Sequence, residues 1–143
     1  MEVVSLVTKG RASLKRIALF PLTLAVAACV TLDPRPTEDI VAGRAQARVD
    51  LLMSGDYEGS YAYTTPGYRS TERPNRYASR WAGVSMWTAA EVDRVSCESA
   101  EPATRCKVAM RVDFKAVKWG ESSTILQEQW IYTDGNWFLY QNF

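Results

Sequence analysis

Residues 106–116 read CKVAMRVDFKA, and this stretch decides the fold. Strict alternation of apolar with mostly polar residues is typical of a β-strand that buries one face. The stretch therefore predicts a strand with one face in a hydrophobic core and the other in solvent. The apolar positions are Cys106, Val108, Met110, Val112, Phe114 and Ala116, and the charged ones are Lys107, Arg111, Asp113 and Lys115.

The segments on both sides of this strand continue the sheet. After Gly83 the spacing at which apolar residues recur changes from the helical ~3.6 residues to ~2 residues, which is typical of strands. Strands are predicted at 87–97 before the central strand, and at 124–132 and 137–143 after it. The last two are separated by the sequence DGN at 134–136, which favours a hairpin turn.

The register of the first two strands predicts an irregularity. If Cys97 lies opposite Cys106, strict alternation turns Glu91 and Asp93 toward the core. Burying two unpaired carboxylates is expensive. A β-bulge between Asp93 and Arg94 adds one residue, which moves the carboxylates out and keeps the cysteines paired. We therefore predict that bulge.

The part of the chain before Gly83 has helical periodicity and capping residues. Thr37 and Asp56 are good N-caps, and Gly55 is a good stop. About three helices followed by antiparallel strands predict an α+β domain whose helices pack on one face of a four-stranded sheet. The predicted helices are 38–54, a short one that follows Asp56 and is broken at 64–67, and one from Ser70 or Thr71 to about Ala82.

The N-terminal residues have the layout of a secretory signal peptide, in which a basic group precedes an apolar helix. The apolar run 17–28 is shorter than the ~20 residues that a membrane-spanning helix needs, and it contains Pro21. A buried helix of a soluble domain, the other alternative, leaves the basic group without a role. That group consists of Lys9, Arg11, Lys15 and Arg16.

The sequence LAVAAC at 24–29 resembles the lipobox of bacterial lipoproteins. The resemblance implies cleavage after Ala28 and lipidation of Cys29, and thus a membrane as partner. It also implies the outer membrane, on its periplasmic face, because Val30 stands where lipoproteins retained in the inner membrane usually have Asp. The predicted organisation is a signal peptide at 1–28, the lipidated cysteine and a tether at 29–36, and one domain at 37–143.

Composition excludes several classes of function. The chain contains no histidine, which removes His-based catalytic triads and His-ligated metal sites. Residues 1–28 hold four of the 17 Lys and Arg residues and one of the 16 Asp and Glu residues, so the rest carries a net charge of −2. Such a charge gives no reason to expect a nucleic-acid partner. We also predict no metal and no other cofactor.

Three cysteines occur in the chain. With Cys29 lipidated, Cys97 and Cys106 remain as an even pair in an oxidising compartment, where disulfides form and persist. We therefore predict a bridge between them. Two buried free thiols are the alternative, because sequence alone does not show the geometry.

The domain also resembles the nuclear transport factor 2-like superfamily, and more closely the small bacterial lipoproteins of unknown function with that fold. The resemblance spans about 37–143 and implies a curved sheet that wraps the long helix into a cone with an open end. Members include ketosteroid isomerase, limonene epoxide hydrolase and SnoaL-type polyketide cyclases, besides many that are not catalytic. Their catalytic sets do not carry over, because this chain has no histidine. The segments that carry the resemblance are LLMSGDYEGSY (51–61), PGYR (66–69), EQW (128–130) and DGNW (134–137).

Glu128 is the one weak catalytic candidate. It shares a strand face with Leu126 and Trp130, and burial among them could raise its pKa toward the range of a general base. The alternative is a solvated glutamate on the outer face. Asp113 is a poorer candidate still, because cross-strand charge pairing explains it.

Two further groups of side chains are candidates for binding. Four arginines at spacings of four, three and four would form one basic stripe on a continuous helix, able to meet lipid phosphates. Salt bridges on a solvated face are the alternative, and Pro74 interrupts the helix. The arginines are Arg69, Arg73, Arg76 and Arg80, and the aromatic residues expected to line a pocket are Tyr61, Tyr77, Trp81, Trp130 and Trp137.

The leading hypothesis is a lipid-anchored envelope protein without catalytic activity, which binds or positions an envelope protein or a small hydrophobic ligand. A purely structural protein of the envelope is a further possibility. The alternative is a small lipid-anchored enzyme, such as an isomerase, hydrolase or cyclase, acting on a hydrophobic substrate in the cone. A buried carboxylate without a partner would favour the enzyme. A cone filled by its own Trp and Tyr side chains would favour the binding protein.

Overall fold

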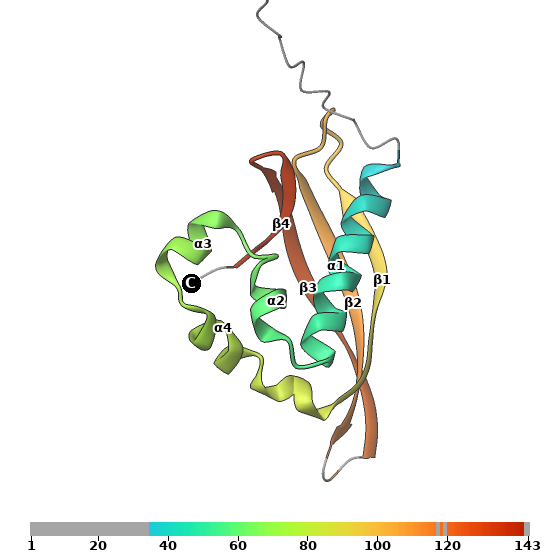
Figure 1. Ribbon diagram of the computed structural model, residues 1–143. Helices are drawn as coiled ribbons and strands as arrows, with labels where there is room; N and C mark the ends of the chain where they lie inside the picture. Colours follow the sequence, from blue (N-terminus) through green and yellow to red (C-terminus); the bar gives the residue numbers. More distant parts are fainter. Residues whose placement is uncertain (1–34, 117, 119, 142–143) are drawn as a thin grey trace, which may run out of the picture. The chain divides into compact units, whose positions relative to one another are not determined.

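A computed structural model of the chain describes residues 35–116, 118 and 120–141 (Figure 1). The chain divides into two compact units, Met1–Leu32 and Asp33–Phe143, and all described residues belong to the second. The predictions about the signal peptide, Cys29 and Val30 lie outside the described residues. Within the described part, no helix is long and apolar enough to cross a membrane.

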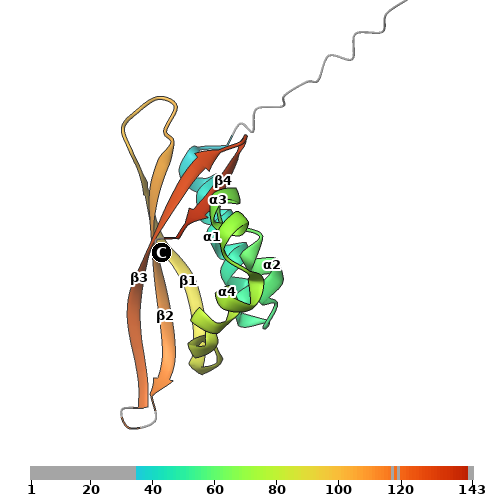
Figure 2. The same cartoon turned by 90° about the vertical axis from the view of Figure 1, so that its left-hand side faces the viewer.

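The second unit is an α+β domain in which helices cover one face of a curved sheet, as Figure 2 shows. The sheet is antiparallel throughout, with the strand order β1-β2-β3-β4. The predicted four-stranded α+β architecture is therefore confirmed. The strands are β1 (Trp87–Cys97), β2 (Arg105–Ala116), β3 (Gly120–Thr133) and β4 (Asn136–Tyr140), and the helices are α1 (Thr37–Met53), α2 (Tyr57–Tyr61), α3 (Pro66–Thr71), α4 (Pro74–Arg80) and the 3₁₀ helix η1 (Ala82–Met86).

The alternating strand lies at the centre of the core. Val108, Met110 and Val112 of β2 are completely buried. Opposite them, α1 presents Val41 and Ala45, which lie one helical turn apart on its inner face. The helical period of α1 and the period of two in β2 thus meet in one apolar layer.

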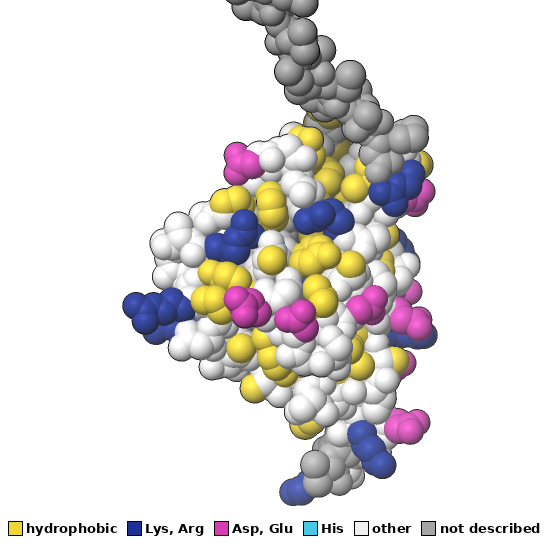
Figure 3. Space-filling model, in the orientation of Figure 1, with side chains coloured by type: hydrophobic (Ala, Val, Ile, Leu, Met, Phe, Trp, Pro, Cys, Tyr) yellow, Lys and Arg dark blue, Asp and Glu magenta, His cyan; other side chains and the backbone are white. Residues whose placement is uncertain are grey.

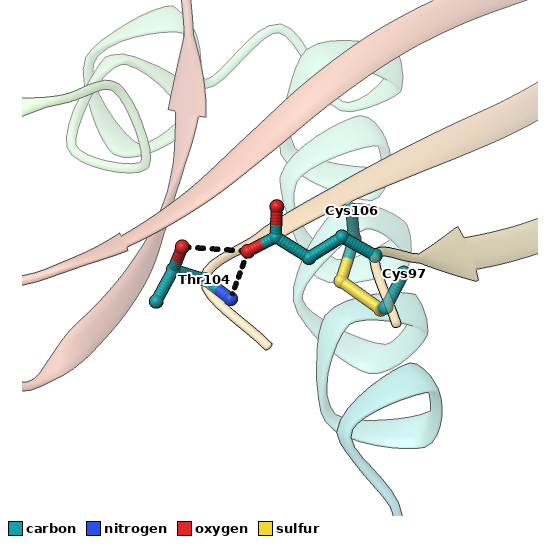
Figure 4. Close-up of a disulfide and its surroundings, with 4 residues drawn as sticks. Cys97, Thr104 and Cys106 are labelled. Carbon is teal, nitrogen blue, oxygen red and sulfur yellow. Dashed lines mark hydrogen bonds between the residues drawn. A yellow bond between two sulfur atoms is a disulfide. The ribbon is translucent and has the colours of Figure 1, made fainter. Parts of the chain in front are cut away.

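The predicted bulge and disulfide are both confirmed. The register between β1 and β2 shifts between Val92 and Arg94, and Cys97 pairs with Cys106. A disulfide joins these two cysteines across the strands (Figure 4). The predicted turn after β3 is also present, since Asp134 and Gly135 have φ values of 50° and 75°, as a tight turn of type I′ requires.

The prediction for the third helix is wrong in its boundaries. A separate helix, α3, begins at Pro66, where a break was expected. It begins there because Thr65 Oγ1 accepts a hydrogen bond of 3.2 Å from the N–H of Tyr68, and because proline suits the first helical position. Pro74 then begins α4 in the same position. The expected cap at Asp56 is confirmed, since its side chain accepts from the Gly59 N–H, whereas Thr37 is the first helical residue and caps nothing.

Candidate functional site

The most unusual feature of the interior is an ion pair between Arg48 and Glu128. Arg48 projects from α1 and is completely buried, and Glu128 on β3 is 7% exposed. Arg48 Nη1 donates to Glu128 Oε1. The second carboxylate oxygen accepts a hydrogen bond of 3.0 Å from the indole N–H of Trp130. Glu128 is therefore a buried acceptor with both oxygens engaged.

The helices supply the rest of the site around the guanidinium. Arg48 Nε donates to the hydroxyl of Tyr77 at 3.3 Å, and that hydroxyl lies 2.7 Å from Ser60 Oγ. The guanidinium carbon lies 4.5 Å from the ring centre of Trp81, within the range of a cation–π contact. Residues from α1, α2, the end of α4 and β3 thus converge on one cation.

Arg48 is not among the residues predicted for a site, although a pattern in the sequence marks it. The buried residues of α1 are Val41, Ala45, Arg48, Val49 and Leu52, which fall at helical spacing on one face. A single cation within an apolar stripe has to find a buried partner. The position of Arg48 therefore predicts an internal carboxylate, but which one depends on the tertiary fold.

Two hydrogen-bond donors of the site have no partner among the described residues. They are Arg48 Nη2 and Trp81 Nε1, and both atoms are buried. A buried donor that is left unsatisfied costs about 1–3 kcal/mol. An acceptor oxygen placed beside Trp81 would recover part of that free energy.

Two crevices flank Trp81 and reach the carboxylate. The larger has a volume of about 520 Å³ and extends toward Leu139 and Tyr140. The smaller has a volume of about 290 Å³ and is lined by apolar side chains that include Val84, Trp87 and Leu126. Trp81, Gln127 and Glu128 line both crevices, so the indole of Trp81 stands between them.

A larger groove lies beside the disulfide and shares Lys107, Gln129 and Tyr140 with the larger crevice. Its volume is about 850 Å³, and Tyr132, Tyr140, Arg105 and Lys107 are among its lining residues. No buried polar atom without a partner lies among its lining residues in the described part of the chain. We place the candidate site at the crevices because both are lined by Glu128 and by Trp81, whose indole N–H has no partner among the described residues.

The structure gathers three of the five predicted pocket aromatics at the Arg48–Glu128 pair: Tyr77, Trp81 and Trp130. Tyr61 is close to this group, with its ring centre 5.6 Å from that of Tyr77, but its hydroxyl donates to the backbone carbonyl of Glu72. Trp137 lies apart from the crevices and packs on Tyr132, with their ring centres 5.5 Å apart.

The four predicted arginines do not share one continuous helix, because α3 ends before Pro74 starts α4. Arg69 donates to the backbone carbonyl of Ala62 at 2.8 Å, whereas Arg76 pairs with Glu72 at 3.4 Å on the surface. Arg80 lies over the ring of Tyr68 at 6.0 Å, and Arg73 precedes α4. On the face in Figure 3, Lys and Arg side chains stand in separate groups among apolar and acidic ones.

Two groups on the helices have pKa values displaced from their usual range. Burial raises the pKa of the Tyr68 hydroxyl, against the opposing effect of the Arg80 cation. Burial lowers the pKa of Arg44, whose guanidinium lies 5.0 Å from the ring centre of Tyr63. Neither group lines a crevice. Among the described residues, no cluster of acidic side chains and cysteines could hold a metal ion.

Comparisons with known proteins inform the fold alone. No protein-family profile matches the chain, and no curated protein matches it either. A SEC-C motif containing protein from Rhodopseudomonas palustris matches 68% of this chain and 73% of its own, with 15% identity and a TM-score of 0.52. A second such protein, from Psychrobacter arcticus, gives 12% identity and a TM-score of 0.57, and the match covers 73% of this chain but only 60% of that one.

A third match carries the name of the superfamily that the sequence resembles. It is described as an NTF2-like transpeptidase from Campylobacter jejuni, with 12% identity and a TM-score of 0.45, covering 68% of this chain and 94% of that one. A score below 0.5 supports no argument about this chain. The observed helices on a curved antiparallel sheet agree with the fold that the resemblance implies.

Proposed function

We propose that this domain is a binding module without catalytic activity, which takes a small and mainly apolar ligand in the crevices beside Trp81. The observation that carries the proposal is the buried pair of Arg48 and Glu128, whose carboxylate side lines both crevices. Apolar walls would bind the body of the ligand, and fixed polar groups would orient it.

The state of Glu128 favours binding over catalysis. A general base needs a carboxylate that can accept a proton from the substrate. Both oxygens of Glu128 already accept hydrogen bonds, from Arg48 and from Trp130. The hydroxyl of Tyr77, the nearest acid, is likewise engaged by Arg48 and Ser60. The alternative of a small enzyme would require this network to open first.

The free donors indicate the chemistry of the ligand. Arg48 Nη2 and Trp81 Nε1 belong to groups in cation–π contact, and each is a buried donor without a partner among the described residues. Both are donors, which favours a carbonyl, carboxylate or sulfonate oxygen over an amine. Val84, Trp87 and Leu126 would contact the rest of the molecule. The ligand class that we propose is therefore an apolar ring system or chain with one acceptor group.

The location is proposed from the sequence. A lipid at Cys29 would hold the domain at the periplasmic face of the outer membrane, with the membrane as its first partner. The disulfide between Cys97 and Cys106 fits such an oxidising compartment. Replacing Cys29 with Ser should abolish labelling by radioactive palmitate, and a labelled variant would contradict the anchor.

A titration with anilinonaphthalene sulfonate tests the crevice, because this probe combines an apolar ring system with a sulfonate. Trp81→Phe removes the indole N–H and keeps an aromatic ring. Loss of one hydrogen bond of about 0.5–1.5 kcal/mol should raise the Kd roughly 2- to 12-fold. Trp137→Phe is the matched control and should bind as the parent does, because Trp137 lines neither crevice. Equal affinities for all three proteins, or no binding to the parent, would contradict the proposal.

A further inference from the structure

The sheet ends in edges that are protected to different degrees. On the outer edge of β1, the side-chain amide of Gln46 accepts from the N–H of Val92 at 3.0 Å and donates to the carbonyl of Ala90 at 3.1 Å. On the outer edge of β4, the N–H of Leu139 donates to Tyr63 and its carbonyl accepts from the N–H of Thr65. These two edges are therefore capped within the molecule at Ala90, Val92 and Leu139.

A third stretch of open edge, on β3, lacks such a cap. Strand β4 pairs only with residues 129–133 of β3, so residues 120–128 of β3 have β2 on one side and no strand on the other. In Figure 1 the first residues of β3 extend with the end of β2 beyond the helices. No hydrogen bond from another described residue reaches the backbone of 120–128 on its outer side.

The hydrogen-bond pattern shows which backbone groups point outward. Gln46 engages Ala90 and Val92 on the outer side of β1, so Glu91 between them bonds inward to its partner Arg111. The next residues of β2, Met110 and Val112, must then bond to β3, opposite Leu126 and Thr124. The backbone N–H and C=O groups that point away from the sheet are those of Glu121, Ser123, Ile125 and Gln127, which are all exposed.

Natural sheets guard long edges with Lys or Pro, with bulges, or by covering them. Residues 120–128, GESSTILQE, contain neither Lys nor Pro, and their register with β2 has no shift. Ile125 is 46% exposed there. An open, regular and largely uncharged edge is a template for another strand.

We propose that this edge pairs with the same edge of a second copy, antiparallel and about a two-fold axis through Thr124. In this register Glu121 lies opposite Gln127 of the partner, so that no like charges face each other. Ser123 lies opposite Ile125, and Thr124 lies opposite its own counterpart. Every outward N–H and C=O of Glu121, Ser123, Ile125 and Gln127 then has a partner. The charges and the two-fold register both fit a second copy of this strand.

Cysteine cross-linking tests the register. Thr124→Cys places the new thiols opposite each other in a pair without mutual hydrogen bonds, where Cβ atoms are ~4.5–5.5 Å apart. Ser122→Cys is the control, because Ser122 lies opposite Leu126 and its thiols would be separated by four residues, about 13 Å. Both changes are made in the full-length protein with Cys29→Ser, kept in detergent. The two Thr37 ends of the proposed dimer point in opposite directions, and in detergent no membrane constrains them.

We expect mild oxidation to link Thr124→Cys into a dimer at least tenfold faster than Ser122→Cys. Ser123→Pro removes only an outward N–H, which an edge strand tolerates. In sedimentation the parent should be a dimer and this variant a monomer, and the circular dichroism spectrum of the variant should match that of the parent. Equal linking rates, a monomeric parent at about 100 μM, or a Ser123→Pro dimer would overturn the inference. A monomeric parent would leave this edge to a strand of another protein.

Discussion

The core of this domain has two parts that differ in chemistry. Between α1 and the sheet it is apolar except for the Arg48–Glu128 ion pair. Its buried residues include Val41, Ala45, Val49, Val108, Met110 and Val112. Among the end of α1, the short helices α2, α3 and α4, and η1, it is built largely from tyrosines. Its buried residues are Leu52, Tyr61, Tyr68, Tyr77 and Val84. We refer to these as the apolar layer and the tyrosine cluster.

The two parts stabilise the domain in different ways. Apolar contacts are non-directional, so the apolar layer gains stability from buried area and tolerates small shifts. The tyrosine cluster is directional, since the Tyr77 hydroxyl bonds to Arg48 and Ser60 and the Tyr61 hydroxyl bonds to the Glu72 carbonyl. A polar network is stable in one arrangement only, because a misplaced member leaves its partners unsatisfied. The apolar layer thus sets the fold, and the tyrosine cluster fixes the candidate site.

The largest effect is expected where the two parts meet, at the buried ion pair. Glu128→Gln keeps the shape and an acceptor for Trp130, but it leaves the Arg48 cation buried without a counter-charge. Breaking a buried pair in this way destabilises by about 3–5 kcal/mol. The measurement is the free energy of unfolding by urea.

A double variant separates charge from shape. Adding Arg48→Met to Glu128→Gln removes the uncompensated cation, so the double variant should be more stable than Glu128→Gln alone. If both variants are equally unstable, the contacts of the long Arg48 side chain matter more than its charge. The site would then be held as the apolar layer is, by packing.

The apolar layer is tested by Met110→Ala, with the next largest effect. Met110 is completely buried, and removing its side chain beyond Cβ leaves a cavity that costs about 3 kcal/mol in unfolding free energy. Met86→Ala is the matched control, because Met86 is 53% exposed and should change the free energy by less than about 0.5 kcal/mol. Binding of anilinonaphthalene sulfonate to Met110→Ala should stay unchanged, and a weakened affinity would show that the two parts are coupled.

Sequence alone predicts the apolar layer well, because its pattern is local. The alternation in β2 predicts which residues are buried, and the cost of burying Glu91 and Asp93 predicts the bulge in β1. The disulfide joins two cysteines that this register places opposite each other. Each of these inferences needs only residues within one hairpin.

The tyrosine cluster and the ion pair could not be predicted in the same way. Arg48 and Glu128 are 80 residues apart, and no local period connects them. The start of α3 was missed because Pro66 was interpreted as a helix breaker, although Thr65 caps the helix and proline fits its first position. Side chains at the site therefore had candidate roles, but their partners depended on the packing of the helices.

The smallest expected effect lies in the sheet, far from the tyrosine cluster, at the loop that the disulfide closes. Glu98 accepts from the hydroxyl of Thr104 at 2.7 Å and from its backbone N–H at 2.8 Å, and these bonds hold the pKa of the Glu98 carboxyl below its usual range (Figure 4). Because the folded pKa is lowered, the resulting stability is present above the unfolded pKa and is lost as pH falls through the folded one. Glu98→Gln keeps an acceptor but does not titrate, so the stability difference between parent and variant should shrink between about pH 5 and pH 3. Urea unfolding at both pH values measures this stability difference between parent and variant. A stability difference that is independent of pH would show that the loop depends on the Cys97–Cys106 bridge and gains nothing from the Glu98 carboxylate.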